Sequence, residues 1–207
     1  MTKLDRSVYF VAMSRRDTRT ALITTGMQLF ATQGYNATGL DAVLKQAAVP
    51  KGSFYHFFGS KEEFGLAVIE EFSGRFLARL DVLLSDPTLT PLDRLRGFLE
   101  RGEAQLAQHQ CTVGCLIGDL GQELAANNER LRARLDEIMR SWRGRFAACI
   151  QEAQQAGELS AAFDPEVMAG FILSGWEGAV LTAKVMKSTQ PVRDFLATLF
   201  ATVLTKP

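Results

Sequence analysis

One stripe of apolar residues runs through residues 128–156 at helical spacing, whereas no sustained two-residue alternation occurs between Phe98 and Phe200. Positions three and four apart share one face of an α-helix, so the stripe predicts a long helix with one buried side. Its members are Leu131, Leu135, Ile138, Trp142, Phe146, Cys149 and Ala153. The Asn-Gly and Asp-Gly pairs that favour tight hairpins are absent. The predicted fold class is therefore all-α.

Clear start signals mark several of the helices. Ser60 and Glu63 form a capping box, and Thr90 and Asp164 each precede a proline at a first helical position. The glycines at 34 and 157 lie where helices are expected to stop. The predicted helices span residues 16–33, 40–47, 51–57, 61–84, 91–109, 115–126, 128–156, 165–186 and 191–204.

Composition favours a globular protein whose two ends differ in charge. The chain has 207 residues, of which 47% are hydrophobic and 22% charged, with a formal net charge of zero. Residues 1–60 carry a net charge of +4 and residues 61–207 a net charge of −4. A basic end on an acidic body suits contact with nucleic acid at that end, although a charge excess of this size is common.

The cysteine content and the hydropathy pattern bear on compartment. Three cysteines are too few for a disulfide framework, which favours a reducing compartment, and we expect a cytoplasmic protein. The most apolar long stretch, Val167–Ala183, contains Glu177 near its centre, so no membrane partner is expected. Residues 1–14 fit either a leader or an ordered arm.

Residues 39–57 have the pattern of a helix-turn-helix. Leu40, Val43 and Leu44 give the first helix an apolar face, and Pro50 disfavours helix at the preceding residue. A second, short helix begins at Lys51 and mixes polar side chains with large aromatic anchors. Two helices joined by a three-residue turn are the geometry that places the second helix in a DNA major groove. The pattern alone fits equally well a polar surface helix over an aromatic core.

The same region resembles the signature of the TetR family of transcriptional regulators. The match runs from Thr38 to Phe64 and includes Lys51-Gly52-Ser53-Phe54-Tyr55-His56-Phe57 followed by Ser60-Lys61-Glu62. The preceding Phe30 to Tyr35 segment also fits the family pattern. The resemblance implies a three-helix DNA-binding domain at residues 15–62 and a helical ligand-binding and dimerisation domain at residues 63–207. It also implies that the partner is double-stranded operator DNA and that the protein is a repressor released by a small-molecule effector.

Specific DNA contacts follow from the resemblance. It implies phosphate contacts for Lys51, Tyr55, His56 and Lys61. The alternatives are that Tyr55 packs under its helix and that Lys61 is simply a solvated charge. Where the family usually has a small hydroxyl residue, this chain has Pro50, which costs no hydrogen bond at a helix start.

Further contacts are implied on either side of these residues. Thr38 is expected to cap the second helix and touch a phosphate, and Gly52 to allow close approach. Ser53, together with Lys51, is the candidate for reaching base edges. Arg15 and Arg16 are expected to add phosphate or minor-groove contacts.

The last two predicted helices have the character of a dimer interface. Gly170, Ser174 and Gly178 recur every four residues, which lets another helix approach closely. The final segment carries a broad apolar face: Phe195, Leu196, Leu199, Phe200, Val203 and Leu204. A helix this apolar needs a partner, and pairing two helices from each of two chains predicts a homodimer. The alternative is that both faces are buried within one chain.

A second resemblance concerns the effector. Val113-Gly114-Cys115-Leu116 and the segment Trp176–Lys184 resemble the AcuR/NemR subgroup of the TetR family, whose members respond to acrylate and reactive electrophiles. It implies that Cys115 is a reactive thiol and that Lys184 is a nearby cation that lowers the thiol pKa or pairs with a carboxylate. Trp176 and Phe98 are expected to form pocket wall. The alternatives are a buried cysteine at a helix start and a reversible, non-covalent ligand.

Three further interpretations of the sequence are a metal site, a thiol enzyme and a helical adaptor. His109, Cys111 and Cys115 include soft metal ligands, but no fourth ligand is evident, so no metal or other cofactor is expected. A thiol enzyme would need a base near Cys115, and the two histidines are His109 and His56, the latter in the DNA-binding motif. The chain is therefore not expected to be an enzyme. A helical adaptor without DNA binding is the remaining alternative.

Overall fold

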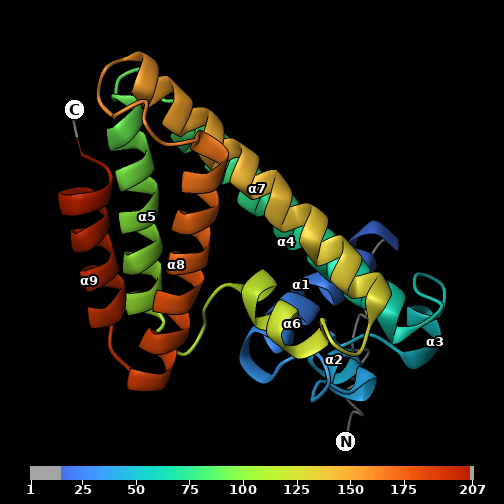
Figure 1. Ribbon diagram of the computed structural model, residues 1–207. Helices are drawn as coiled ribbons and strands as arrows, with labels where there is room; N and C mark the ends of the chain where they lie inside the picture. The colour runs from blue at the N-terminus through green and yellow to red at the C-terminus, as the bar shows by residue number, and fades with distance from the viewer. Residues whose placement is uncertain (1–14, 206–207) are drawn as a thin grey trace, which may run out of the picture.

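The computed structural model describes residues 15–205, which contain helices and no strand, so the predicted all-α class is confirmed (Figure 1). The α-helices are α1 (Arg15–Gln33), α2 (Leu40–Ala47), α3 (Lys51–Phe54), α4 (Lys61–Leu84), α5 (Pro91–Gln108), α6 (Leu116–Leu124), α7 (Glu129–Gln155), α8 (Pro165–Met186) and α9 (Gln190–Thr198). A short π-helical segment, Leu199–Val203, follows α9 directly. The predicted leader or arm at residues 1–14 lies outside the described residues.

The predicted helix starts are confirmed by their caps. The Ser60 hydroxyl accepts the Glu63 N–H at 3.1 Å, and the Thr90 hydroxyl accepts the Asp93 N–H at 3.3 Å. The Asp164 carboxylate accepts two backbone N–H groups of the first turn of α8. Each cap satisfies N–H groups that a helix leaves unpaired at its start.

Two helix ends differ from the prediction by more than two residues. The third helix was expected to reach residue 57, but α3 ends at Phe54, whose carbonyl accepts both the Phe57 and the Phe58 N–H. This turn brings the buried Phe58 ring back toward Phe54. The last helix was expected to continue to residue 204 as one α-helix, but it widens at Leu199, and the Leu204 N–H reaches back to the Leu199 carbonyl.

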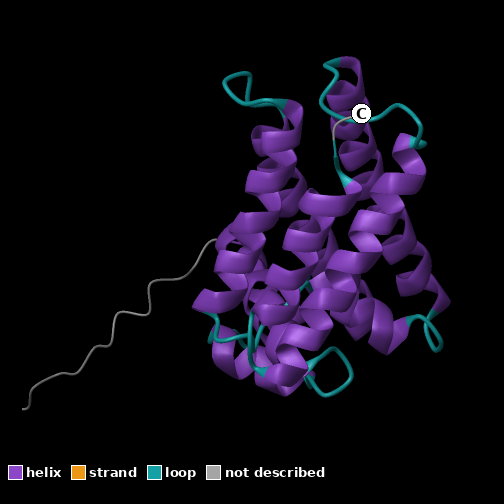
Figure 2. Cartoon of the chain, turned by 60° about the vertical axis from the view of Figure 1, so that its left-hand side comes forward, coloured by secondary structure: helices purple, strands orange, loops and turns teal. Residues whose placement is uncertain are grey.

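The two longest helices, α4 and α7, form the spine of the molecule. They run side by side in the same direction, because Glu62, Glu70 and Asp81 along α4 pair in order with Arg130, Arg134 and Arg145 along α7. Figure 1 shows α1, α2, α3 and α6 gathered at one end of this spine and α5, α8 and α9 at the other. The rotated view in Figure 2 shows that the described part is made of helices joined by loops.

The apolar core follows this division. The first cluster joins side chains of α1, α2 and α3 to those of α6 and to the N-terminal halves of α4 and α7. The second joins α5, α8 and the chain end to the C-terminal halves of α4 and α7. Helix α6, although late in sequence, therefore packs with the N-terminal helices. None of the helices in the described part is both long and apolar enough to span a bilayer.

Candidate DNA-binding surface and effector site

A tight turn separates α2 from α3. Ala48 adopts a left-handed conformation with φ 54°, and its N–H and that of Val49 reach back to carbonyls of α2. Pro50 is extended, with φ −61° and ψ 145°, and serves as the N-cap of α3. The turn redirects the chain within three residues, as the helix-turn-helix pattern predicted.

Aromatic rings anchor α3 to the core. Phe54 is fully buried, and its ring centroid lies 5.3 Å from that of Phe58 and 5.5 Å from that of Phe64. The Phe54–Phe64 pair is edge-to-face, and a contact of this kind stabilises a pair by about 0.5–1.5 kcal/mol beyond the area that it buries. One short helix is thereby held rigidly while its other side faces outward.

The outward side of α3 carries polar groups. Lys51, Gly52, Tyr55 and His56 are exposed, and Ser53 is half-buried. The Tyr55 side chain is 54% exposed and touches the Phe54 ring edge-on, so it lies beside the core and not under the helix. A methyl group added at Gly52 would meet no atom, which leaves its backbone open to an approaching ligand.

Lys51 is available for an anion. Its ammonium lies 3.5 Å from the Asp41 carboxylate, and both side chains are mostly exposed. An exposed ion pair at this distance contributes little, so the exchange of Asp41 for a phosphate would cost little.

Thr38 does not do what was expected. The N-cap of α2 is Gly39, without a side-chain cap, and Thr38 is 1% exposed. Its hydroxyl donates to the Gly34 carbonyl at 2.6 Å. The expectation that Thr38 caps α2 is wrong, because the hydroxyl closes the α1–α2 turn, and its burial keeps it from a phosphate in this conformation.

Lys61 begins α4 and is half-buried. Its ammonium lies 4.4 Å from the centroid of the Tyr35 ring and donates to the Asn36 carbonyl at 3.4 Å. Partial burial lowers the Lys61 pKa. The side chain is therefore held against the α1–α2 turn and is not a freely solvated charge. At the other end of this surface Arg15 is exposed, while the side chain of Arg16, in the first turn of α1, lies outside the described part.

The expected sensor Cys115 is the N-cap of α6 and is half-buried. Burial raises the pKa of its thiol well above the ordinary value, and the Glu177 carboxyl, in hydrogen-bonding contact with the sulfur, raises it further. Hydrogen bonds from the backbone N–H groups of Gly118 and Ile117 lower the pKa of the Cys115 thiol, but by less than the other effects raise it. The expectation that a neighbouring Lys184 lowers this pKa is wrong, because the group against the sulfur is an acid.

Lys184 is already paired. Its ammonium donates to both oxygens of the Asp119 carboxylate at 2.7 Å, and both side chains are about one-quarter exposed. Its aliphatic part passes beside Gly114 at the start of the Cys115 segment. Cys115 and Asp119 of α6 thus meet Glu177 and Lys184 of α8, and we call these four residues the α6–α8 junction.

Glu177 is the least expected member of this junction. Burial raises its pKa to about 7, and Asp119 also raises it, while the contact with Cys115 and the charge of Lys184 lower it. A carboxylate oxygen of Glu177 lies where a side chain on Gly118 would begin, so only glycine fits at that position of α6. Sequence reasoning missed Glu177 and Asp119, although an acid in an apolar helix and three glycines near Cys115 are recognisable signals.

Phe98 lies on α5, one turn before Gly102, whereas Trp176 lies on α8. The Trp176 ring crosses Gly102, where an added methyl group would come within 2.6 Å of it. Phe98 packs edge-on against Phe76, with ring centroids 5.7 Å apart. Phe76 in turn stacks on Trp142, whose indole N–H is buried without a hydrogen-bond acceptor in the described part. Such a donor is costly to leave unpaired and suits an oxygen-bearing ligand.

The other candidate ligands of the sequence lie apart from this junction. Cys111 is buried with φ 54°, in a small cluster with Leu106 and Val192, whereas Cys115 packs against the core shared by α1 and α6. Within residues 15–205 no group of three or more His, Cys, Asp or Glu side chains could hold a metal ion.

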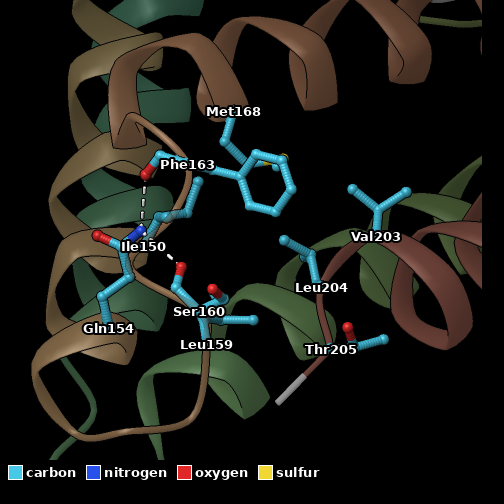
Figure 3. Close-up of a pocket in the computed structure, with 9 residues that line it drawn as sticks. All are labelled: Ile150, Gln154, Leu159, Ser160, Phe163, Met168, Val203, Leu204 and Thr205. Carbon is cyan, nitrogen blue, oxygen red and sulfur yellow. Dashed lines mark hydrogen bonds between the residues drawn. The ribbon is translucent and has the colours of Figure 1, made fainter. Parts of the chain in front are cut away.

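A separate small pocket lies at the far end of α7 (Figure 3). It is lined by Ile150, Gln154, Leu159, Ser160, Phe163, Met168, Val203, Leu204 and Thr205. The side-chain N–H groups of Gln154 donate to the carbonyls of Ser160 and Phe163 at 3.0 and 2.8 Å. With no charged side chain and its amide donor satisfied, this pocket offers a ligand few directional contacts.

Comparison with known proteins bears on both halves of the chain. Residues 22–68 match the family described as "Bacterial regulatory proteins, tetR family". Residues 91–199 match "Tetracyclin repressor-like, C-terminal domain".

Individual relatives match along most of the chain. The transcriptional regulator AcuR of Cereibacter sphaeroides is 43% identical over 178 residues, covering 86% of this chain and 81% of that protein. The transcriptional repressor NemR of Escherichia coli is 33% identical over 184 residues, covering 89% and 92%. The crystal structure of E. coli NemR in its reduced form superposes with a TM-score of 0.86 at 32% identity, covering 92% of this chain and 98% of that one.

Proposed function

Since the chain belongs to the TetR family of bacterial regulatory proteins, we propose that it is a homodimeric transcriptional repressor that binds operator DNA through α3 and is released by a small effector. A ligand-responsive, DNA-binding regulator is the function of its relatives. Effector binding releases DNA if the effector binds more tightly to a conformation in which the α3 helices of the two subunits no longer fit the DNA.

The observation that carries the proposal is the rigidly anchored α3 with its exposed polar side. Lys51 and His56 supply hydrogen-bond donors there, Tyr55 an exposed hydroxyl, and Gly52 an open backbone. Phosphate contacts position a protein on DNA, whereas contacts to base edges specify the sequence. We assign the phosphate contacts to Lys51, Tyr55 and His56, and the base contacts to Lys51 and Ser53.

The flanking positions complete this surface. Lys61 is held against the α1–α2 turn, and it is proposed to contact a phosphate from there. Arg15 and Arg16, at the start of α1, are proposed to add phosphate or minor-groove contacts. We place the DNA-binding domain at residues 15–62 and the effector-binding and dimerisation domain at residues 63–207.

The dimer is proposed to form through α8. Val167, Phe171, Leu181 and Val185 are exposed large apolar side chains on that helix, between 42% and 77% exposed. The small residues Ser174 and Gly178 are exposed between them. Together these positions recur at alternating steps of four and three residues, the spacing of a helix-packing seam. A two-fold pairing along this seam presents two copies of α3 to a palindromic site.

The effector is proposed to act at the junction of α6 and α8, beside Cys115 and Lys184, and Trp176 and Phe98 are proposed to supply pocket wall. A small electrophile or an unsaturated carboxylate remains the proposed class, as in the resemblance to AcuR and NemR. The E. coli NemR structure is of a reduced form of that relative. The raised pKa of the Cys115 thiol favours a second candidate, an effector that binds reversibly without a covalent bond. In either case the chain acts by binding and not by catalysis, in the cytoplasm where its operator lies.

A gel-shift assay on the DNA upstream of the protein's own gene, at about 150 mM salt, tests the proposal. Wild type and Cys115→Ser are compared with and without acrylate or N-ethylmaleimide. A specific shift that is released in wild type alone establishes a covalent thiol sensor. Release of both proteins establishes a reversible site. The absence of any specific shift would refute operator binding.

A further inference from the structure

A carboxylate of α6 holds the turn that leads into the DNA-binding helices. The two oxygens of Glu123 accept the backbone N–H groups of Tyr35 and Asn36 at 2.8 and 2.6 Å. The turn follows Gly34, which ends α1 with φ 82°, and the carboxylate lies so close that a methyl group at Gly34 would come within 2.9 Å of it. Hydrogen bonds from N–H groups to an ionised carboxylate are about twice as strong as neutral ones.

The turn held by Glu123 sets the positions of the elements that follow it. The Thr38 hydroxyl ties its far side to the Gly34 carbonyl, immediately before α2. The Lys61 ammonium, at the start of α4, lies on the Tyr35 ring and donates to the Asn36 carbonyl. A movement of Glu123 is therefore expected to move the start of α2 and the first residue of α4. Because α3 lies between these two elements in sequence, its position changes with them.

The same helix is fixed to the body of the molecule at its other end. Asp119, one turn before Glu123, holds the Lys184 ammonium of α8, and Cys115 contacts Glu177 of α8. The apolar side of α6 is buried in the core that it shares with α1. A short helix moves as a unit, because backbone hydrogen bonds link its successive turns, which lie 5.4 Å apart along the axis.

We propose that Glu123 is the positioning residue through which the α6–α8 junction controls the DNA-binding helices. Separation of α6 from α8 withdraws the carboxylate from the Tyr35 and Asn36 amides, and the turn before α2 loosens. The regulatory meaning of this coupling rests on the proposed function, but the coupling itself is a property of the free protein.

A wedge between α6 and α8 tests the coupling without DNA or effector. Gly118→Leu forces a side chain into the space that Glu177 occupies, whereas Gly121→Leu places the same side chain on the same helix, where the nearest atom, the Met139 methyl carbon, is 3.9 Å from the new Cβ. Hydrogen exchange of the Tyr35 and Asn36 amides is measured by NMR, with the Leu99 amide of α5 as a reference for global opening.

Gly118→Leu is expected to speed exchange of both amides at least about tenfold, with the Leu99 amide and the Gly121→Leu variant changed less than about twofold. Glu123→Gln, which keeps one acceptor oxygen, is expected to speed the same two amides in either background, with no further effect of the wedge. If Gly118→Leu does not fold, Gly118→Ala provides a smaller wedge. Unchanged exchange of the two amides in a folded wedge variant, or equal acceleration at Leu99, would overturn the proposal. Because no DNA is present, a failure here is distinct from a failure of operator binding.

Discussion

At the scale of single residues, the junction between α6 and α8 is governed by burial of ionisable groups. The Cys115 thiol and the Glu177 carboxyl are in contact, and the pKa of each is raised, chiefly because burial disfavours the charged form. A protonated thiol is a poor nucleophile, so in this conformation Cys115 is expected to react slowly with electrophiles. Lys184 is paired with Asp119, so its positive charge is not directed at the Cys115 sulfur and does not stabilise the thiolate.

The first prediction concerns the reactivity of Cys115. Glu177→Gln removes a negative charge beside the sulfur, so the thiol pKa falls and the thiolate fraction at neutral pH rises. We expect alkylation of Cys115 by N-ethylmaleimide to be several-fold faster than in wild type, measured by peptide mass spectrometry so that each cysteine is followed separately. Glu166→Gln, at the exposed start of α8, is the control and is expected to leave the rate unchanged. A slower rate in Glu177→Gln would mean that the carboxylate assists the reaction by accepting the thiol proton.

The second prediction concerns stability and pH. Glu177 has a pKa of about 7 in the folded chain against an ordinary value of 4.5, so the folded state binds the proton more tightly than the unfolded state. Stability is therefore lost as pH rises through this interval, by up to about 3 kcal/mol. Glu177→Gln, which resembles the protonated acid, is expected to match wild type near about pH 4.5 and to exceed it above about pH 7. Urea unfolding at both pH values measures the difference, and a variant less stable than wild type at the higher pH would contradict the assignment.

At the scale of elements, close helix packing fixes the DNA-binding half. Helices α1 and α4 approach at Gly26, where an added methyl group would come within 2.5 Å of the Phe64 ring. The turn after α1 meets α4 at Gly65, beside the Tyr35 ring. These contacts place α1 against the aromatic core that also anchors α3, so the packing of α1 on α4 determines where α3 lies.

The third prediction follows from this packing. Gly26→Ala improves helix propensity by up to about 1 kcal/mol but overfills a packed contact, at a cost of about 1–3 kcal/mol. We expect a net loss of stability in chemical unfolding. Gly97→Ala in α5, where the added methyl group meets nothing within 4 Å, is the matched control and is expected to stabilise the chain by about 0.5–1 kcal/mol. Equal effects of the two substitutions would mean that α1 and α4 are not in close contact at Gly26.

Sequence patterns predicted most of the elements because the signals for helices are local. The capping residues Ser60, Thr90 and Asp164 and the apolar stripe of α7 lie within a few residues of what they specify. The end of α3 was missed because it depends on the Phe58 ring turning back to a core built from distant residues. The partners of Cys115 and Lys184 were missed for the same reason, since Glu177 and Asp119 lie 62 and 65 residues away from them along the chain and only the fold brings them together.

At the scale of the whole molecule, a single chain exposes an apolar seam on α8 that a second copy is proposed to cover. Phe171, in the middle of that seam, is 53% exposed. The fourth prediction is that Phe171→Glu places a charge in the interface and gives monomers in analytical ultracentrifugation at concentrations where wild type is dimeric. Phe163→Glu, also at an exposed apolar position but outside α8, is the control and is expected to remain dimeric. A dimeric Phe171→Glu protein would place the interface elsewhere.

Two copies of α3 are proposed to bind a symmetric operator, and DNase footprinting on the DNA upstream of the protein's own gene tests this proposal. The predicted result is a protected, palindromic region with half-sites about one helical turn apart, lost in Lys51→Ala at about 150 mM salt. Protection without sequence preference, or a footprint that Lys51→Ala leaves unchanged, would contradict it.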